Sequence, residues 1–178
     1  MSLFYFPEDE FMLGDPKYDA MYKRLGEDST EIVCLSADSI IDIHDYMIRL
    51  HGGSYGLRDD DLFHSVVVAP FQTMFGTDLY PTVFDKAAKY LFDFANYQIF
   101  IDGNKRTGYA VCDMFLYKNG FNLTLTPERA YALVMDIANH RYNDSSEIVD
   151  ILENNFLFCD RAPTGPDPEQ TEMYFPMR

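Results

Sequence analysis

The chain of 178 residues lacks tryptophan, has only three cysteines and carries 14 basic against 29 acidic side chains. Cys34, Cys112 and Cys159 are odd in number and far apart, which argues against a disulfide framework or a cysteine-based metal site. The formal net charge of −15 makes nonspecific binding to nucleic acid or to an anionic membrane unfavourable. The sequence shows neither a signal peptide nor a long apolar run. We therefore expect a cytoplasmic protein with no DNA partner and no membrane partner.

Phenylalanine and tyrosine are abundant, with 15 and 13 copies, and they predict a core rich in aromatic packing. A chain of this length is expected to form one compact domain that buries roughly 70% of its unfolded surface. We place this domain at residues 35–158. Residues 1–34 are expected to form an acidic, aromatic extension with a short helix near Tyr18 to Leu25, and residues 159–178 a proline-containing tail.

The spacing of apolar residues predicts an all-α domain. Six segments combine a helix start signal with apolar residues at helical spacing, and they begin near Ser36, Asp59, Thr82, Gly103, Thr126 and Asp144. Residues 71–80 fit this pattern poorly. Aromatic and β-branched residues around Gly76 allow a short hairpin or flap whose edge could pair with an extended target, while a packed loop is the favoured alternative. We expect His44 to be a packed, hydrogen-bonded residue rather than a ligand.

The segment from Gln98 to Gly108 is the strongest candidate for a functional site. Asp102-Gly103-Asn104 reads as a turn, and a helix begins there. The first turn of this helix carries Asn104, Lys105, Arg106 and Thr107. Cations at a helix N-terminus oppose the helix dipole, so local stability does not explain them. A bound anion does, because free backbone N–H groups together with two cations form a phosphate cradle.

A divalent cation fits the same segment, because the carboxylate of Asp102 could hold an ion that bridges phosphate oxygens. The alternative is a solvated turn in which Asp102 only caps the helix. The two readings differ in what they require of the folded protein. The phosphate cradle requires that Lys105 and Arg106 do not turn away from each other, and it needs a cavity in front of the loop rather than a loop walled off by its own chain.

The string from Phe100 to Gly108, Phe-Ile-Asp-Gly-Asn-Lys-Arg-Thr-Gly, closely resembles the signature of the Fic/Doc (Fido) family in its Doc, or death-on-curing, form. That signature reads His-x-Phe-x-Asp-(Ala/Gly)-Asn-Lys-Arg-Thr, and its His falls on Gln98 in this chain. Further stretches resemble Doc landmarks in the same order, namely Ile43-His44-Asp45, Gly52-Gly53, Gly56-Leu57-Arg58-Asp59, Tyr80-Pro81 and Ala87-Ala88. The fold implied over residues 35–156 is the six-helix Fido core with a short flap.

The resemblance implies a reaction class, because Fido proteins transfer part of a nucleotide to a protein hydroxyl. Members that transfer AMP generally carry Gly at the position of Lys105 and a second Arg at the position of Tyr109. The chain therefore looks like Doc, a toxin that moves the γ-phosphate of ATP to a threonine of elongation factor Tu. ATP, Mg²⁺, a protein target of the translation-factor type and an antitoxin acting in trans are the implied partners. Transfer of AMP stays an alternative.

The family roles map onto the motif residue by residue. The resemblance implies that Phe100 anchors the loop in the core and that Asp102 binds Mg²⁺. Phosphate contacts are implied for Asn104, Lys105 and Arg106, with help from backbone N–H groups of Gly103 to Thr107. Such a site works by positioning and electrostatics.

Gln98 departs from the family at the residue that removes the proton from the target hydroxyl. A glutamine amide has no useful basicity, although it forms hydrogen bonds. Losing a general base typically costs ~10²–10⁴ in rate, or about 3–5 kcal/mol of barrier. The residue could be natural, a deliberate substitution, or part of chemistry without a histidine base. A regulatory pseudoenzyme that binds a nucleotide or a partner, and a helical interaction domain with a relic motif, are the competing readings.

Overall fold

The computed structural model describes residues 32–159, and the structural statements below concern these residues. Most of them lie in six α-helices, with two short 3₁₀ turns. The helices are α2 (Ala37–His51), α3 (Asp60–Val68), α4 (Val83–Asn96), α5 (Asn104–Lys118), α6 (Pro127–Ala138) and α7 (Val149–Glu153), and the turns are η1 (Ala69–Phe71) and η2 (Ser145–Ile148). The six-helix expectation is thus confirmed. The predicted helix near Tyr18 to Leu25, and nearly all of the predicted extension and tail, lie outside the described residues.

Side-chain caps explain why the helices begin where they do. Ser36 accepts a hydrogen bond from the N–H of Ser39 at the start of α2, and Thr82 forms a reciprocal capping box with Asp85 at the start of α4. At the start predicted near Asp144, the sequence pattern of Asp144 and Glu147 suggests a capping box, and this is wrong in detail. The carboxylate of Asp144 accepts from the N–H of Ser146, only two residues ahead, and a 3₁₀ turn precedes α7.

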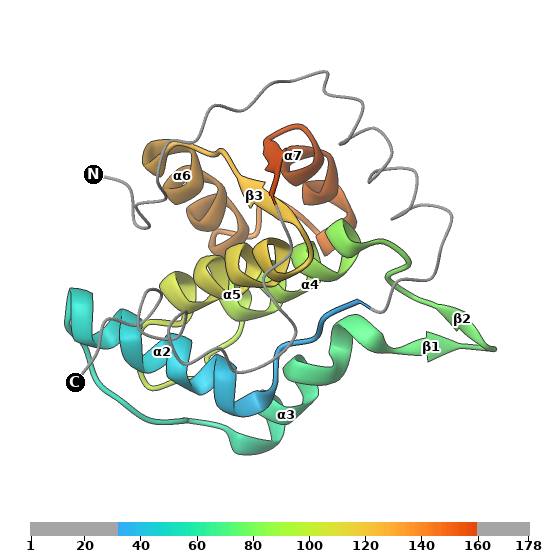
Figure 1. Cartoon of the computed structure of the whole chain (residues 1–178). Helices are drawn as coiled ribbons and strands as arrows, with labels where there is room; N and C mark the ends of the chain where they lie inside the picture. Colours follow the sequence, from blue (N-terminus) through green and yellow to red (C-terminus); the bar gives the residue numbers. More distant parts are fainter. Residues whose placement is uncertain (1–31, 160–178) are drawn as a thin grey trace.

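The core lies around α4 and α5, which pack side by side through the middle of the domain (Figure 1). Helices α2 and α3 lie on one side of this pair, and α6 and α7 lie on the other. Gly108 allows the close approach of α5 to α4, because a Cβ there would lie 2.8 Å from Cβ of Phe94. Ala87 and Ala88 are fully buried on α4. The central pair fixes the position of the segment that joins them, which carries the candidate site.

A second pair of short strands was not predicted. Strand β3 (Phe121–Leu123) pairs antiparallel with β4 (Phe156–Phe158). The rings of Phe121, Phe156 and Phe158 pack against one another, and Phe84 of α4 joins them. Strands of three residues are too short to show an alternating pattern in the sequence. The pair ties the chain after α7 back to the end of α5.

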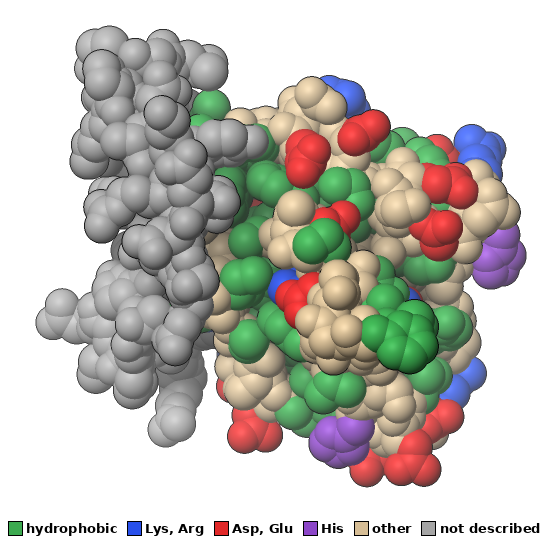
Figure 2. All heavy atoms as spheres, turned by 90° about the vertical axis from the view of Figure 1, so that its right-hand side faces the viewer, with side chains coloured by type: hydrophobic (Ala, Val, Ile, Leu, Met, Phe, Trp, Pro, Cys, Tyr) green, Lys and Arg blue, Asp and Glu red, His purple; other side chains and the backbone are tan. Residues whose placement is uncertain are grey.

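The segment before α4 forms a hairpin, here called the flap, with strands β1 (Thr73–Met74) and β2 (Thr77–Asp78). Its turn, Phe75-Gly76, has φ values of 51° and 79°, as a two-residue hairpin turn with positive φ requires. The packed-loop alternative is therefore wrong. Hydrophobic side chains gather on the face that carries the flap (Figure 2). Met74 and Leu79 are exposed there, and Phe75 is fully exposed.

Candidate functional site

The loop between α4 and α5 is held against a neighbouring segment by backbone hydrogen bonds. Phe100 forms an isolated antiparallel bridge with Leu57. The N–H of Arg58 donates to the carbonyl of Ile99 at 2.8 Å, and the N–H of Ile101 donates to the carbonyl of Gly56 at 2.9 Å. Ile99 and Phe100 are buried, so Phe100 lies where a residue that anchors the loop in the core is expected to lie. The chain then emerges at Ile101 with its position fixed.

Asn104 closes this loop with its side chain. Its Oδ1 accepts from the N–H of Phe100 at 2.7 Å, and its Nδ2 donates to the carbonyl of Phe100 at 2.9 Å. The residue is only 8% exposed. The family comparison implies a phosphate contact here, but the amide group is engaged with the loop backbone. Asn104 therefore shapes the cradle, and its backbone N–H lies in the first turn of α5.

The first turn of α5 has no side-chain cap. Gly103 is the N-cap residue, in the left-handed region at φ 78°. The carboxylate of Asp102 accepts from the adjacent N–H of Gly103 at 2.6 Å and makes no capping bond to the helix. The alternative in which Asp102 only caps α5 is thus wrong. Free N–H groups at a helix start without a capping side chain are available to an anion.

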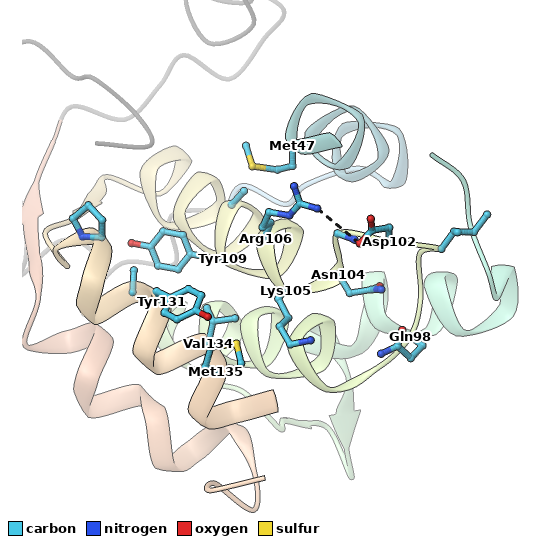
Figure 3. Close-up of a pocket in the computed structure, with 15 residues that line it drawn as sticks. Met47, Gln98, Asp102, Asn104, Lys105, Arg106, Tyr109, Tyr131, Val134 and Met135 are labelled. Carbon is cyan, nitrogen blue, oxygen red and sulfur yellow. Dashed lines mark hydrogen bonds and ion pairs between the residues drawn. The ribbon is translucent and has the colours of Figure 1, made fainter. Parts of the chain in front are cut away.

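Lys105 and Arg106 leave α5 in different directions (Figure 3). The guanidinium of Arg106 donates to the carbonyl of Gly52 at 3.0 Å and lies 3.8 Å from Oδ1 of Asp102. Lys105 has no ion-pair partner within residues 32–159. The requirement that the two cations do not turn away from each other is met only in part. Neighbouring helix positions are rotated by about 100°, so the side chains diverge, but both line the same cavity. A ligand that meets both must lie across the end of the helix.

The carboxylate of Asp102 is half exposed and lies beside the close-packed backbone of Gly53. A Cβ at Gly53 would come within 2.5 Å of Oδ2 of Asp102 and within 3.0 Å of Ile48. Gly53 also has φ 128°, a conformation that side chains rarely adopt. Gly53, which was identified in the sequence only within a Doc-like stretch, therefore makes room for the carboxylate.

A cavity of about 410 Å³ opens in front of this loop, as the phosphate-cradle reading requires. Its walls come from α2, the loop, the first half of α5 and one face of α6 (Figure 3). Four predicted polar residues line it, namely Gln98, Asp102, Lys105 and Arg106. Gly103 and Asn104 also line it, whereas Thr107 is buried and does not.

The other end of the cavity is apolar and was missed in the sequence. Tyr109 of α5 lies there beside Tyr131, Val134 and Met135 of α6 (Figure 3). One signal was present, because Tyr131, Val134 and Met135 are three and four residues apart and so share one face of the helix, where Tyr131 is 69% exposed. No sequence pattern shows that α6 folds over the motif, since this contact is set by tertiary packing.

Ionisable groups behind this apolar wall have shifted pKa values. Burial, with the nearby charge of Asp113 as a second cause, raises the pKa of the Tyr109 hydroxyl, which stays protonated at neutral pH. Burial also raises the pKa of Asp113 to about 7. Tyr109 therefore presents a neutral ring and a hydroxyl donor to the cavity, without adding negative charge.

No histidine lines the cavity among the described residues. His44 is only 1% exposed and contacts the carbonyl of Asp102 in the loop, so it is a packed, hydrogen-bonded residue as expected. His64 is exposed on α3. The part of the chain described here also contains no cluster of three His, Cys, Asp or Glu side chains suited to a metal ion. Any metal at Asp102 must then take most of its ligands from elsewhere.

The loop, its glycines and the helix that follows it match a known family. A Fic/DOC family model matches residues 34–116. The chain is 38% identical over 89 residues to the protein named Toxin Doc of Mycolicibacterium smegmatis, covering 49% of this chain and 68% of that protein. It is 30% identical over 96 residues to Protein kinase doc of Escherichia phage P1, covering 54% and 75% respectively. The chain belongs to the Fic/Doc family.

Within residues 32–159, no helix is long and apolar enough to cross a membrane.

Proposed function

We propose that the chain binds ATP with Mg²⁺ in this cavity and acts as a Doc-type phosphotransferase on a protein hydroxyl, with chemistry weakened by Gln98. The observation that carries the proposal is the two-ended cavity. One end presents Asp102, Lys105, Arg106 and the uncapped start of α5, and the other end is apolar and aromatic. A nucleotide has the same division between a charged phosphate chain and a flat base.

The residues present fit a magnesium ion that arrives with the nucleotide. Mg²⁺ is usually held by one or two carboxylates together with phosphate oxygens and water. Asp102 supplies one half-exposed carboxylate at the cavity, and Gly53 leaves room beside Oδ2. When bound, the ion would neutralise charge on the phosphates.

The phosphate chain would meet the N–H groups of the first turn of α5 and the two divergent cations. Arg106 is already oriented by the carbonyl of Gly52, so it loses little freedom on binding. Lys105 has no such restraint in the described structure and is free to follow the terminal phosphate. The base would lie against Tyr109 and Tyr131, since aromatic rings stack on nucleobases.

Gln98 stands where the family motif has its proton acceptor, and it is exposed at the polar end of the cavity. Its amide can orient the target hydroxyl but cannot take its proton. We therefore infer weak phosphate transfer by this chain. By family resemblance the target is a translation factor such as elongation factor Tu, and control is exerted by an antitoxin in trans. The names Toxin Doc and Protein kinase doc of the two relatives support this direction.

The test separates binding from chemistry. We expect the chain to bind ATP with Mg²⁺ in calorimetry, and Asp102→Asn to lose most of the Mg²⁺-dependent part. Gln98→His should raise transfer of label from γ-labelled ATP to elongation factor Tu by ~10²–10⁴. Gln98→Asn, which is equally non-basic, is the matched control. Absence of labelled product with the histidine variant would count against the enzymatic part of the proposal.

A regulatory nucleotide-binding pseudoenzyme is the second candidate. It is favoured by the absence of any basic side chain at Gln98 and of any histidine among the cavity-lining residues in the described structure. If the unsubstituted chain and the Gln98→His variant both bind ATP and neither transfers phosphate, the pseudoenzyme candidate is favoured. Transfer of label from α-labelled ATP would instead indicate AMP transfer, which Tyr109 disfavours because AMP-transferring relatives carry Arg there.

A further inference from the structure

His44 contacts the candidate site from below, although it lies 58 residues before Asp102 in the chain. Its ring stacks on Phe100 at a centroid distance of 3.8 Å and an interplanar angle of 7°. Its Nε2 lies 3.1 Å from the backbone carbonyl oxygen of Asp102, and its Nδ1 lies 3.0 Å from Oδ1 of Asp45. The ring is thus held on three sides, by a stack and by two polar contacts.

The polarity of the contact with Asp102 follows from its partner. A carbonyl oxygen only accepts, so Nε2 of His44 carries the hydrogen and donates it. The carboxylate of Asp45 also accepts only, so its contact with the opposite ring nitrogen is a hydrogen bond when Nδ1 carries a hydrogen as well, and this contact orients the ring from the outer side. The stack on Phe100 sets the ring plane. Together these contacts aim one N–H of His44 at one carbonyl of the loop.

Fixing this carbonyl also fixes the direction of the next N–H group. In a planar trans peptide the C=O and the following N–H point in opposite directions. With the carbonyl of Asp102 directed at His44, the N–H of Gly103 points the other way, where it meets Oδ1 of Asp102 at 2.6 Å. Gly103 has positive φ and no side chain, so by itself it would leave this peptide free to rotate.

We propose that His44 is a positioning residue that holds the Asp102–Gly103 peptide in the orientation needed for ligand binding. It acts through the backbone and fixes the position of the Asp102 carboxylate and the direction of the N–H groups at the start of α5. The functional part of this inference rests on the proposed binding of ATP with Mg²⁺. The geometric part, a donor that prevents rotation of one peptide, stands independently of it.

Two substitutions separate the hydrogen bond from the packing. His44→Phe keeps a ring against Phe100 and removes the donor, whereas His44→Gln keeps a donor and removes the ring. Phe63→Leu is the matched control, because Phe63 is buried with its ring 5.8 Å from the same Phe100 ring and its side chain has no hydrogen-bond donor. A purely structural role would make His44→Phe and the control behave alike.

Calorimetry with Mg²⁺ and ATP on the full chain gives the functional readout. We expect His44→Phe to weaken binding by roughly 10–100-fold, as loss of an outer partner of a metal ligand typically does. His44→Gln should recover part of the affinity, and Phe63→Leu should lower the melting temperature without changing the affinity. Equal affinity of His44→Phe and the unsubstituted chain overturns the proposal.

Nuclear magnetic resonance tests the geometric part independently of ATP binding. If neither the unsubstituted chain nor any variant binds ATP, the proposed function is contradicted, and the geometric part can still be measured. In the unsubstituted chain, we expect a slowly exchanging Nε2–H resonance from His44. His44→Phe should shift the Gly103 amide resonance strongly, and the Phe63→Leu control should not. A rapidly exchanging Nε2–H overturns the inference without any variant, and so does an unmoved Gly103 resonance in His44→Phe.

Discussion

The two connections at the ends of α4 are built alike at one level and differently at another. The flap precedes the helix and the Asp102 loop follows it, and each turns at a glycine, with φ 79° at Gly76 and 78° at Gly103. Each is also held through backbone carbonyls by one buried basic side chain. Lys86 donates to the carbonyls of Pro70 and Tyr80 at the base of the flap, and His44 contacts that of Asp102.

The difference lies at the turn itself. A Cβ on Gly76 would meet nothing within 4 Å, whereas one on Gly103 would lie 2.8 Å from the buried side chain of Ile48. The flap is fixed at its base and bare at its tip, while the Asp102 loop is fixed at the turn. An element that positions a ligand needs the second arrangement, and an element that meets another molecule can use the first.

The largest expected effect separates the two glycines. Gly103→Ala should lower the free energy of unfolding by about 3 kcal/mol, because backbone strain adds to the clash with Ile48. Gly76→Ala should cost only about 1 kcal/mol, from backbone strain alone. Urea denaturation of the two variants measures both values. Equal losses would show that the two turns are not packed differently.

Replacing the anchor of the flap comes next. Lys86→Met should lower the free energy of unfolding by about 3 kcal/mol, because it removes a buried cation and leaves the carbonyls of Pro70 and Tyr80 and the carboxylate of Asp78 without their shared donor. Hydrogen exchange should speed up at the N–H of Leu79, which bonds across the flap, and not at that of Ile101 in the Asp102 loop. Faster exchange at both sites would mean that the two connections are coupled.

A change of pH provides a perturbation of α5 that involves neither connection. The folded-state pKa of Asp113, about 7, lies above its ordinary value of 3.8, so the folded protein binds the proton more tightly than the unfolded chain. This contribution is full below pH 4 and is lost as pH rises toward and through 7. Asp113→Asn should therefore be more stable than the unsubstituted chain at pH 8, on the order of 2 kcal/mol. Parallel stability curves between pH 4 and 8 would contradict the burial of this carboxylate.

The smallest expected effect is at the tip of the flap. Phe75→Asn places a residue that tolerates positive φ before Gly76, in a pair common in such hairpin turns. Since the ring of Phe75 is fully exposed, we expect no loss of stability and a gain of a few tenths of a kcal/mol. Thermal unfolding measures it. A clear loss would show that the ring packs against the domain in solution.

How much of the molecule could be predicted depends on how local each cause is. The starts of α2, α4 and α6 were predicted because the capping residues Ser36, Thr82 and Thr126 act within three residues of themselves. The β3–β4 pair was missed because its two short strands are far apart in the sequence and come together only when the chain folds. The same holds for the wall that α6 adds to the cavity.

The candidate site divides in the same way. The turn at Gly103 and the helix after it were predicted from the motif, and the structure brings Gln98, Asp102, Lys105 and Arg106 to one cavity. The engagement of the Asn104 amide with Phe100 and the divergence of the two cations were not predicted. Both depend on side-chain directions, which residue types alone do not define.

The divergence of Lys105 and Arg106 has a consequence for selectivity. Because the two side chains leave the helix about 100° apart, we expect a single inorganic phosphate to gain less from the pair than a longer anion does. A polyphosphate chain laid across the end of α5 would reach both. We therefore expect the start of α5 to select anions by their length more than by their charge.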